Sequence, residues 1–351
     1  MADPGPFPAR RGRLTIGLLA LLLAASILVA VGVGAVWISP WDALRLIAWK
    51  LGMTGAPRGI PSWAPVILFQ LRMPRVLLAA LVGAALAVAG AVFQALFRNP
   101  MADPAIIGVS SGAALGAIVV ILVGWGAALD ALGVPAAAFA GALLTALLVF
   151  RLARVGPGVQ VATLLLAGIA VAAVVSAAIS LVMTFSGQEV DRIYFWLLGS
   201  FAAATWPQVL LVSPLLVAGS AVAFALAGDM NLATLGEERA AQLGQDVERF
   251  KRVMLATGSL LAAAAVSFSG LIGFVGLMTP HILRLLVGPD HRRLVPASML
   301  GGATFMVLAD LAARTVVVPQ EIPVGAVTAL LGGPFFLYLL RRQRRAAGAR
   351  G

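Results

Sequence analysis

A possible nucleophile stands at Ser110, within Gly108-Val109-Ser110-Ser111-Gly112, which matches the Gly-x-Ser-x-Gly pattern of serine hydrolases. In those enzymes the serine lies on a strand-to-helix turn beside a histidine base. Here the pattern follows a proline turn and enters an apolar run, and both histidines, His281 and His291, come near the end of a much later run. Small residues that pack helices are the simpler interpretation, and an intramembrane serine hydrolase is the remote alternative.

Metal and nucleotide chemistry find little support in the sequence. The chain has no cysteine, which excludes a catalytic thiol and Cys-ligated metal sites, and His281 has no further ligands at metal-binding spacing. A phosphate loop ends in Gly-Lys-Ser/Thr, but Lys50 precedes Leu51 and Lys251 precedes Arg252. We therefore expect no catalytic residue, metal or cofactor on this chain, and any ATP and Mg would be held by a partner.

The composition is that of a polytopic membrane protein. Hydrophobic residues make up 61% of the 351 residues and charged residues 11%, whereas soluble domains carry about 25% charged residues. Crossing the hydrocarbon core takes about 20 apolar residues, and charge-free runs of that scale recur. We predict an all-α fold with ten transmembrane helices, at 14–37, 76–97, 105–124, 134–151, 161–184, 207–227, 253–268, 271–288, 296–313 and 323–340.

The predicted helices form a single permease domain, 14–341, between an N-terminal tail, 1–13, and a basic C-terminal tail, 342–351. An even count of spans puts both termini on one side. That side then holds 18 of the 25 Lys and Arg residues, and the positive-inside rule makes it the cytoplasm. The net charge of +11 is thus explained by membrane orientation, and no basic stripe with interleaved aromatics indicates nucleic acid.

The spans contain essentially no ionisable residues. Ion channels and proton-coupled carriers usually have such residues within their spans, although each costs about 2.5–3.5 kcal/mol at the bilayer centre. A cavity lined by small and apolar side chains is better suited to a bulky substrate that is held weakly. A secondary carrier that needs no partner remains a rival to a transporter driven by a separate ATPase.

One polar segment, 228–252, interrupts the apolar sequence. It contains nine charged residues, whereas the flanking runs 193–228 and 253–283 contain none. Thr234 and Glu237 match a capping box, and Gly244 is typical of a helix stop. We expect a short helix followed by a second short helix, projecting into the cytoplasm.

Local signals also predict three features of the connections and spans. Trp41 and Trp49 are of the residue type that favours the membrane interface, and a surface helix is expected around 41–51. Asp103 is placed to cap the helix that follows. Gly112 and Gly116 have the small-xxx-small spacing that permits close helix contact.

Five blocks give the chain a resemblance to a known family: LRMPR at 71–75, GAVFQALFRNPMADPAIIGVSSGAALG at 90–116, LGEERAAQLG at 235–244, GFVGLMTPHILRLLVGPDHR at 273–292 and EIPVGAVTALLGGPFF at 321–336. In this order they resemble the permeases of ABC importers for iron-siderophores, haem and vitamin B12, the FecCD/BtuC-like type II importers. The resemblance implies a multi-pass inner-membrane homodimer with two cytoplasmic ATPase subunits and a periplasmic or lipid-anchored binding protein.

The resemblance also implies roles for individual residues. The block at 235–244 resembles the coupling helix that sits in a groove of the ATPase, and its residues are Leu235, Gly236, Glu237, Glu238, Arg239, Ala240, Leu243 and Gly244. Family arginines that pair with glutamates on the binding protein are matched by Arg72, Arg75 and Arg314. Residues near the cytoplasmic gate are matched by Asn99 and Met101, and the fifth and tenth spans resemble those lining the central pathway.

Two positions depart from the family pattern. Met101 stands where leucine is more usual, and Ala202-Ala203-Ala204 replaces a stretch often richer in glycine, after the outer end of the fifth span. The function that the resemblance implies is import of a bulky iron chelate driven by ATP hydrolysis on a partner, with a ferric siderophore favoured over vitamin B12 and haem. The chain itself would be a transport subunit and no enzyme.

Overall fold

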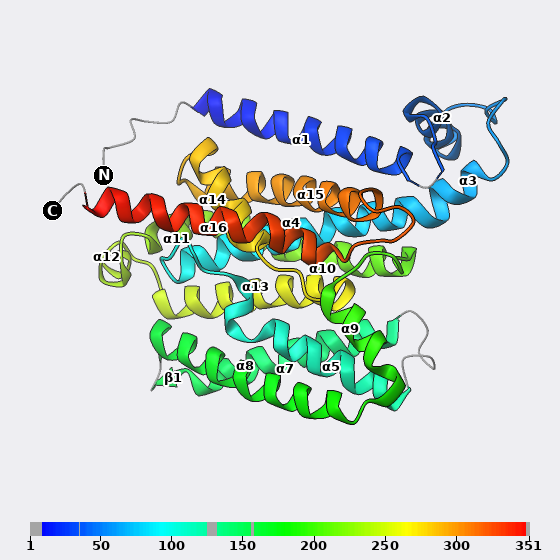
Figure 1. Ribbon diagram of the computed structural model, residues 1–351. Coiled ribbons are helices and arrows are strands. Elements are labelled where there is room, and N and C mark those ends of the chain that lie inside the picture. The colour runs from blue at the N-terminus through cyan, green and yellow to red at the C-terminus, as the bar shows by residue number, and fades with distance from the viewer. Residues whose placement is uncertain (1–8, 35, 125–131, 156–157, 349–351) are drawn as a thin grey trace.

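The computed structural model describes residues 9–34, 36–124, 132–155 and 158–348, and its regular structure is almost entirely helical (Figure 1). In this part of the chain the one sheet is an antiparallel hairpin of β1 (Arg154–Val155) and β2 (Gly158–Val159). The predicted all-α class is confirmed. The long helices are α1 (Ala9–Gly32), α4 (Met73–Leu96), α5 (Val109–Val123), α7 (Gly133–Leu152), α8 (Val161–Thr184), α10 (Trp206–Ala225), α13 (Val247–Ser269), α14 (Val275–Val287), α15 (His291–Thr315) and α16 (Val324–Gly348).

Short helical segments fill most of the connections. They are α2 (Pro40–Lys50), α3 (Ala64–Val66), the π-helical η1 (Ile67–Arg72), the 3₁₀ turns η2 (Pro104–Ile107) and η4 (Gly187–Glu189), α9 (Val190–Leu198), α11 (Ala227–Ala233) and α12 (Glu237–Gln242). The surface helix expected around 41–51 is confirmed as α2. Asp103 caps η2 by accepting a hydrogen bond of 2.8 Å from the Ala105 N–H, so it caps the turn before α5 and not α5 itself.

Each of the ten predicted spans overlaps one long helix, but they differ in length. Among the described residues, seven helices are long and apolar enough to cross a membrane. The other three, Val109–Val123, Val275–Val287 and Val324–Leu339, are shorter. At 1.5 Å per residue the 13-residue α14 spans about 20 Å, less than the roughly 30 Å of a hydrocarbon core. The count of ten transmembrane helices stays a prediction.

The helix α4 forms the centre of the bundle. It continues α3 and η1, so that residues 64–96 make one helix of 33 residues, 89% buried over its most apolar part. It packs against α10, α13, α14 and α15. At Gly90 a Cβ would overlap the carbonyl oxygen of Gly276 in α14, so glycine is required for this close approach. The second span therefore begins twelve residues earlier than predicted, and places Arg72 and Arg75 within the helix.

A second close pair is formed by α5 and α7. A Cβ on Gly112 or Gly116 would overlap atoms of α7, among them the carbonyl oxygens of Gly141 and Ala137. The predicted small-xxx-small contact is confirmed. The helix α8 packs against α7. It is the most exposed of the long apolar helices, with 6% of its most apolar stretch buried.

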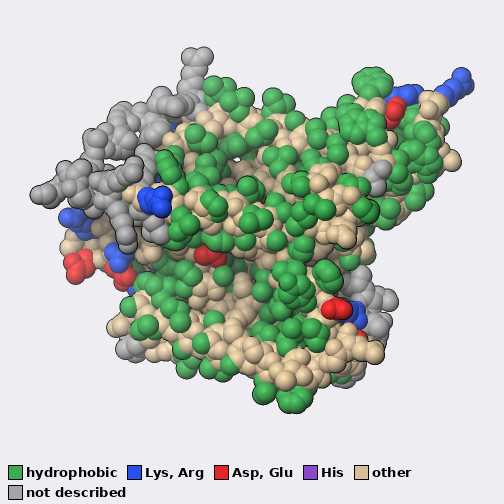
Figure 2. All heavy atoms as spheres, in the orientation of Figure 1, with side chains coloured by type: hydrophobic (Ala, Val, Ile, Leu, Met, Phe, Trp, Pro, Cys, Tyr) green, Lys and Arg blue, Asp and Glu red, His purple; other side chains and the backbone are tan. Residues whose placement is uncertain are grey.

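The two ends of the bundle differ in character. Near one end, called the α12 end below, lie α11, α12, the start of α1 and the last turn of α16, and α2 lies at the opposite α2 end (Figure 1). The described starts and ends of the outermost helices thus agree with termini on one side. Figure 2 shows hydrophobic side chains over the middle of the visible face and most charged side chains toward the two ends, as expected for a chain that crosses a bilayer.

The polar segment 228–252 differs from its prediction in two respects. Gly236 and not Thr234 is the N-cap residue of α12, and the Thr234 hydroxyl donates to the Asn231 carbonyl oxygen at 2.6 Å. The capping box was wrong because Thr234 ends α11, the helix before α12. The expected second short helix after α12 is instead the first turn of α13, which runs without interruption to Ser269. Gly244, at φ +89°, ends α12 as predicted.

Candidate functional site at the two ends of the bundle

The helix α12 presents a mixed apolar and charged surface. Leu235 and Leu243, which flank it, are 50% and 61% exposed, and Glu238 and Arg239 are exposed between them. Large apolar side chains on an otherwise polar projection are typical of a docking surface. Ala240 is buried and fixes α12 to its own chain. Gly236, at φ +104°, gives the sharp entry into the helix that an L side chain would strain.

Lys251 ties α12 to two other elements. Its Nζ donates to Glu237 Oε2 in α12 at 2.6 Å, to Glu248 Oε1 in α13 at 3.1 Å and to the carbonyl oxygen of Val159 in β2 at 3.2 Å. Glu248 Oε2 in turn accepts from the Val159 N–H at 3.0 Å. All three N–H groups of the ammonium are therefore paired. The base of α8 is thereby linked to α12.

The preceding helix α11 is anchored to the start of α15. Asn231 Nδ2 donates to Asp290 Oδ1 at 2.7 Å, and Asn231 Oδ1 accepts from the His291 N–H at 2.9 Å. Asp290 caps α15 through the Arg292 N–H at 3.0 Å. Although burial raises the pKa of Asp290, the hydrogen bonds from Asn231 and Arg292 and the charges of Arg293 and Arg292 hold it below the usual carboxyl value.

The loop expected to form the gate follows α4. Asn99 is exposed and Met101 half-buried, and the Asn99 side chain holds the turn because its Oδ1 accepts from the Met101 N–H at 2.9 Å. Arg98, just before them, has φ +49°. Between this loop, α11 and α14 lies a cavity of about 490 Å³. The gate role itself stays a prediction.

At the α2 end, the LRMPR block lies where the π-helix η1 passes into α4. Pro74 has no N–H to donate, and the ladder widens just before it: the Met73 N–H reaches the Leu68 carbonyl oxygen, five residues back. The extra residue turns Arg72 toward α1, where it is 7% exposed. Its Nη1 donates to the carbonyl oxygens of Val31 at 2.9 Å and Gly32 at 2.7 Å.

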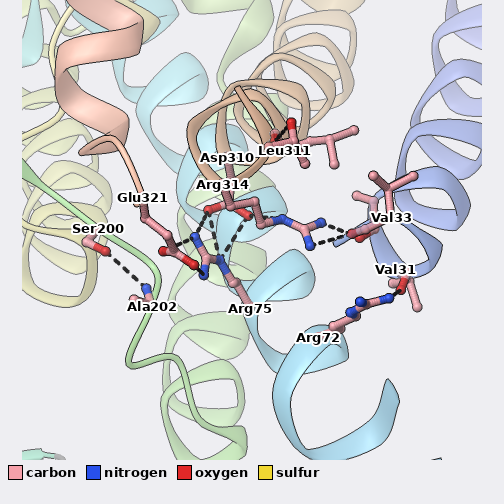
Figure 3. Close-up of polar contacts among 12 residues, drawn as sticks. Val31, Val33, Arg72, Arg75, Ser200, Ala202, Asp310, Leu311, Arg314 and Glu321 are labelled. Atoms are coloured by element: carbon pink, nitrogen blue, oxygen red, sulfur yellow. Dashed lines mark hydrogen bonds and ion pairs between the residues drawn. The ribbon is translucent and has the colours of Figure 1, made fainter. Parts of the chain in front are cut away.

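The other two arginines share an acidic partner (Figure 3). Arg75 binds the buried Asp310 through Nε at 3.0 Å and Nη2 at 2.9 Å, and it binds Glu321 through Nη1 at 2.9 Å. Arg314 lies 3.4 Å from Asp310 and donates to the carbonyl oxygen of Val33 at 2.7 Å. All three guanidinium groups are therefore engaged within the chain. Their docking role stays a prediction.

Beside the arginines, a cavity of about 350 Å³ opens at the α2 end. Ala202 and Ala203 line it, together with Trp196, Gln208 and Ser269. Two residues of the alanine stretch that departs from the family pattern thus lie in the wall of a cavity at the α2 end. Their position is consistent with a role in substrate choice, and they carry no catalytic group.

Ser110 is not placed as a hydrolase nucleophile. It lies in the first turn of α5, after Gly108 at φ +81° and the 3₁₀ turn η2, so the strand of a nucleophile elbow is missing from the described residues before it. The neighbouring Ser111 hydroxyl donates to the Gly108 carbonyl oxygen at 3.0 Å, which stabilises the helix start. The structure does not favour the hydrolase alternative.

Sequence reasoning predicted that Asp310 and Arg314 can pair, which is confirmed, but it missed the other contacts that hold these sites together. Lys251 and Glu248 lie three residues apart and Asp310 and Arg314 four apart, which is the one signal that each pair shares a helix face. The contacts with Glu237, Val159, Arg75 and Glu321 join distant parts of the chain, and no spacing in the sequence indicates them.

Comparisons with known proteins agree with this architecture. A model of the FecCD transport family matches residues 21–342. The cobalamin import system permease of Halobacterium salinarum is 49% identical over 88% of this chain and 81% of its own length, and the hemin transport system permease of Yersinia pestis is 41% identical over 95% and 96%. A solved metal-chelate type ABC transporter in an inward-facing conformation superposes with a TM-score of 0.81 and 33% identity, covering 93% of this chain and 98% of the solved one.

Proposed function

We propose that this chain, which belongs to the FecCD transport family and is a permease subunit of an ABC importer, carries a bulky metal chelate across the membrane toward its α12 end. The observation that carries the proposal is the match of nearly the whole chain to permeases and to a metal-chelate type transporter. The α12 end would face the cytoplasm, because most of the arginines lie on that side of the predicted topology.

The free energy of ATP hydrolysis on the partner would be transmitted to the permease through α12. A permease of this family works in a membrane complex with ATP-binding and substrate-binding partners. The exposed Leu235 and Leu243, with Glu238 and Arg239 between them, offer the ATPase an apolar contact with a charged rim. Because Lys251 joins Glu237 to β2, a displacement of α12 would be passed to the base of α8.

A second copy of the chain would cover α8 and α16. Both helices expose rows of large apolar side chains: Leu166, Ile169, Val174 and Leu181 in α8, and Leu330, Leu331 and Leu337 in α16. Two copies packed through these faces would enclose a pathway with apolar walls. The chain has no cysteine, so Ile169→Cys gives a clean crosslinking probe. Exposed Leu211→Cys on α10 is the matched control, and crosslinking equal at both sites would argue against this interface.

A binding protein would dock at the α2 end and deliver the chelate above the cavity lined by Ala202 and Ala203. At this end Arg75 is already paired with Glu321, whose side chain is 44% exposed. Glu321 would therefore compete with the binding protein for Arg75. An acidic residue of the binding protein could replace Glu321 on Arg75 while Asp310 keeps its contact. Docking would then exchange one carboxylate for another and leave the buried pair intact.

Within the chelate class, cobalamin is our first substrate, because a cobalamin permease is 49% identical. The ferric siderophore favoured by sequence reasoning is the second. The test is uptake into proteoliposomes that contain the permease, its genomically adjacent ATPase and binding protein, with cobalamin, hemin and a ferric siderophore in parallel. Uptake that requires ATP and one of these chelates is expected. Uptake that persists without ATP would instead favour a secondary carrier.

A further inference from the structure

The cavity of about 490 Å³ at the α12 end has a polar wall that the transport proposal does not use. It is lined where three elements converge: the end of α4 with the loop after it, α11, and the α14–α15 junction. The lining includes residues from two blocks of the family resemblance, 90–116 and 273–292. Its rim is exposed at Arg98, Pro100, Thr234 and Pro289, so a solute can enter from the side on which α12 lies.

His291 is the first residue in the wall with a buried polar atom that lacks a hydrogen-bond partner among the described residues. Asp290 accepts from Asn231 Nδ2, so the Asn231 oxygen faces His291 and accepts from its Nδ1 at 2.8 Å. Because an amide oxygen can only accept, Nδ1 carries the hydrogen, and Nε2 of the neutral imidazole is an acceptor. The residue is 2% exposed and Nε2 has no hydrogen-bond partner among the described residues. Buried acceptors in proteins are normally paired with a donor from the protein, from an ordered water or from a bound molecule.

Gln94 lines the same cavity and holds a second buried acceptor. Its Nε2 donates to the carbonyl oxygens of Leu277 at 3.1 Å and Gly276 at 3.4 Å, and this fixes the amide so that Oε1 is the remaining atom. Gln94 is 3% exposed, and its Oε1 has no partner in the described part of the chain. An occupant of the cavity would therefore find two acceptors to which it can donate hydrogen bonds.

Two arginines supply the positive charge. Arg98 and Arg284 both line the cavity, and neither guanidinium group makes a hydrogen bond or ion pair with any residue that the structure describes. The carboxylate of Asp290 also lines it, but that charge is already bound by Asn231 and the Arg292 N–H. Two free guanidinium groups beside two buried acceptors match an anion that carries its own hydroxyl group.

We propose that this cavity binds inorganic phosphate through Arg98 and Arg284, with the P–OH group donating to His291 Nε2 or Gln94 Oε1. Near neutral pH inorganic phosphate has charged oxygens and keeps at least one proton to donate, whereas a phosphate monoester is mostly the fully ionised dianion. Sulfate has the same shape and charged oxygens but no such proton. This site stands independently of the transported chelate and of α12 coupling.

The test uses the full-length permease in nanodiscs and inorganic phosphate as the probe, with binding measured by calorimetry and by radiolabelled phosphate at pH 7. We expect saturable binding that sulfate competes with at least tenfold more weakly. Arg284→Gln should weaken phosphate binding by about tenfold to a hundredfold, since a hydrogen bond to a charged group is lost. Arg284→Lys should restore part of it. Arg151→Gln, which removes an exposed charge at the end of α7, is the matched control.

Three outcomes would overturn the proposal. One is no binding up to about 10 mM phosphate by wild-type protein that elutes as a single folded species, which would leave a cavity filled with water only. The second is equal affinity for sulfate and phosphate, since His291 and Gln94 would then receive no proton. The third is equal weakening by Arg151→Gln and Arg284→Gln, which would show a diffuse charge effect. None of these results depends on transport, so the transport proposal can fail or succeed separately.

Discussion

Replacing Lys251 by methionine tests whether α12 drives the permease through this side chain. The substitution keeps the apolar stem and removes the ammonium group that joins Glu237, Glu248 and the carbonyl oxygen of Val159. The protein should still assemble, because the core contacts of α13 with α4 and α7 are unaffected. What is lost is the tether between α12 and the base of α8.

The size of the effect follows from exposure. The Lys251 side chain is 10% exposed, but its partners Glu237 and Glu248 are 44% and 37% exposed, so water can take over both carboxylates. The loss therefore lies well below the 3–5 kcal/mol of a fully buried broken pair, and nearer to two surface pairs plus one backbone acceptor, about 1–2 kcal/mol. Such a free energy changes a two-state ratio by a factor of about 5–30.

The assay is chelate transported per ATP hydrolysed in proteoliposomes. We expect this ratio to fall about 5–30-fold in Lys251→Met while the basal ATPase rate is retained, and hydrogen exchange in residues 234–246 should become faster. Lys251→Arg should keep most of the coupling. Lys50→Met, which changes the other lysine of the chain, is the control at the α2 end. A Lys251→Met transport ratio within about twofold of wild type would refute the tether as the route of coupling.

Three further variants test the sites and the core. Gly90→Ala should abolish accumulation of folded protein because the new Cβ overlaps the Gly276 carbonyl oxygen, whereas Gly273→Ala, with open space around its Cβ, should be tolerated; equal yields in detergent would contradict the packing argument. Glu321→Gln should tighten docking of the binding protein, more so at low salt, and surface plasmon resonance that shows unchanged affinity would remove Arg75 from the docking site. Asp290→Asn should lower the melting temperature at neutral pH: the pKa of Asp290 is lower in the folded chain, so its stabilisation is present above the unfolded value of about 3.9 and is lost as pH falls below it. The melting difference should therefore be constant from pH 8 to 5 and shrink as pH falls below about 4; a difference that is undiminished at pH 3 would exclude the charge as its cause.

The arginine sites show which structural features could be predicted from the sequence and which could not. The LRMPR block identified Arg72 and Arg75 by residue type, and hydropathy placed them near a helix end. Hydropathy could not reveal that Pro74 is accommodated by a π-helical turn, which rotates Arg72 onto the carbonyl oxygens of α1. Reversing the charge of Arg72 would therefore bury a carboxylate among carbonyl oxygens and misfold the protein. Glu321→Gln is for this reason the sharper probe of docking.

The polar segment 228–252 could be predicted from the sequence only in part. Its charge contrast with two apolar neighbours predicts a projection, and Gly244 predicts where α12 ends, because both signals are local. The capping box failed since Thr234 satisfies a carbonyl oxygen of the helix before it, a choice decided by the anchoring of α11 on Asp290 and His291. That anchoring joins positions about sixty residues apart, and it also sets the tautomer of His291. The same contact thus positions α11, the helix that leads into α12. It also places His291 in the wall of the cavity, so a ligand there would rest against the anchor of α11.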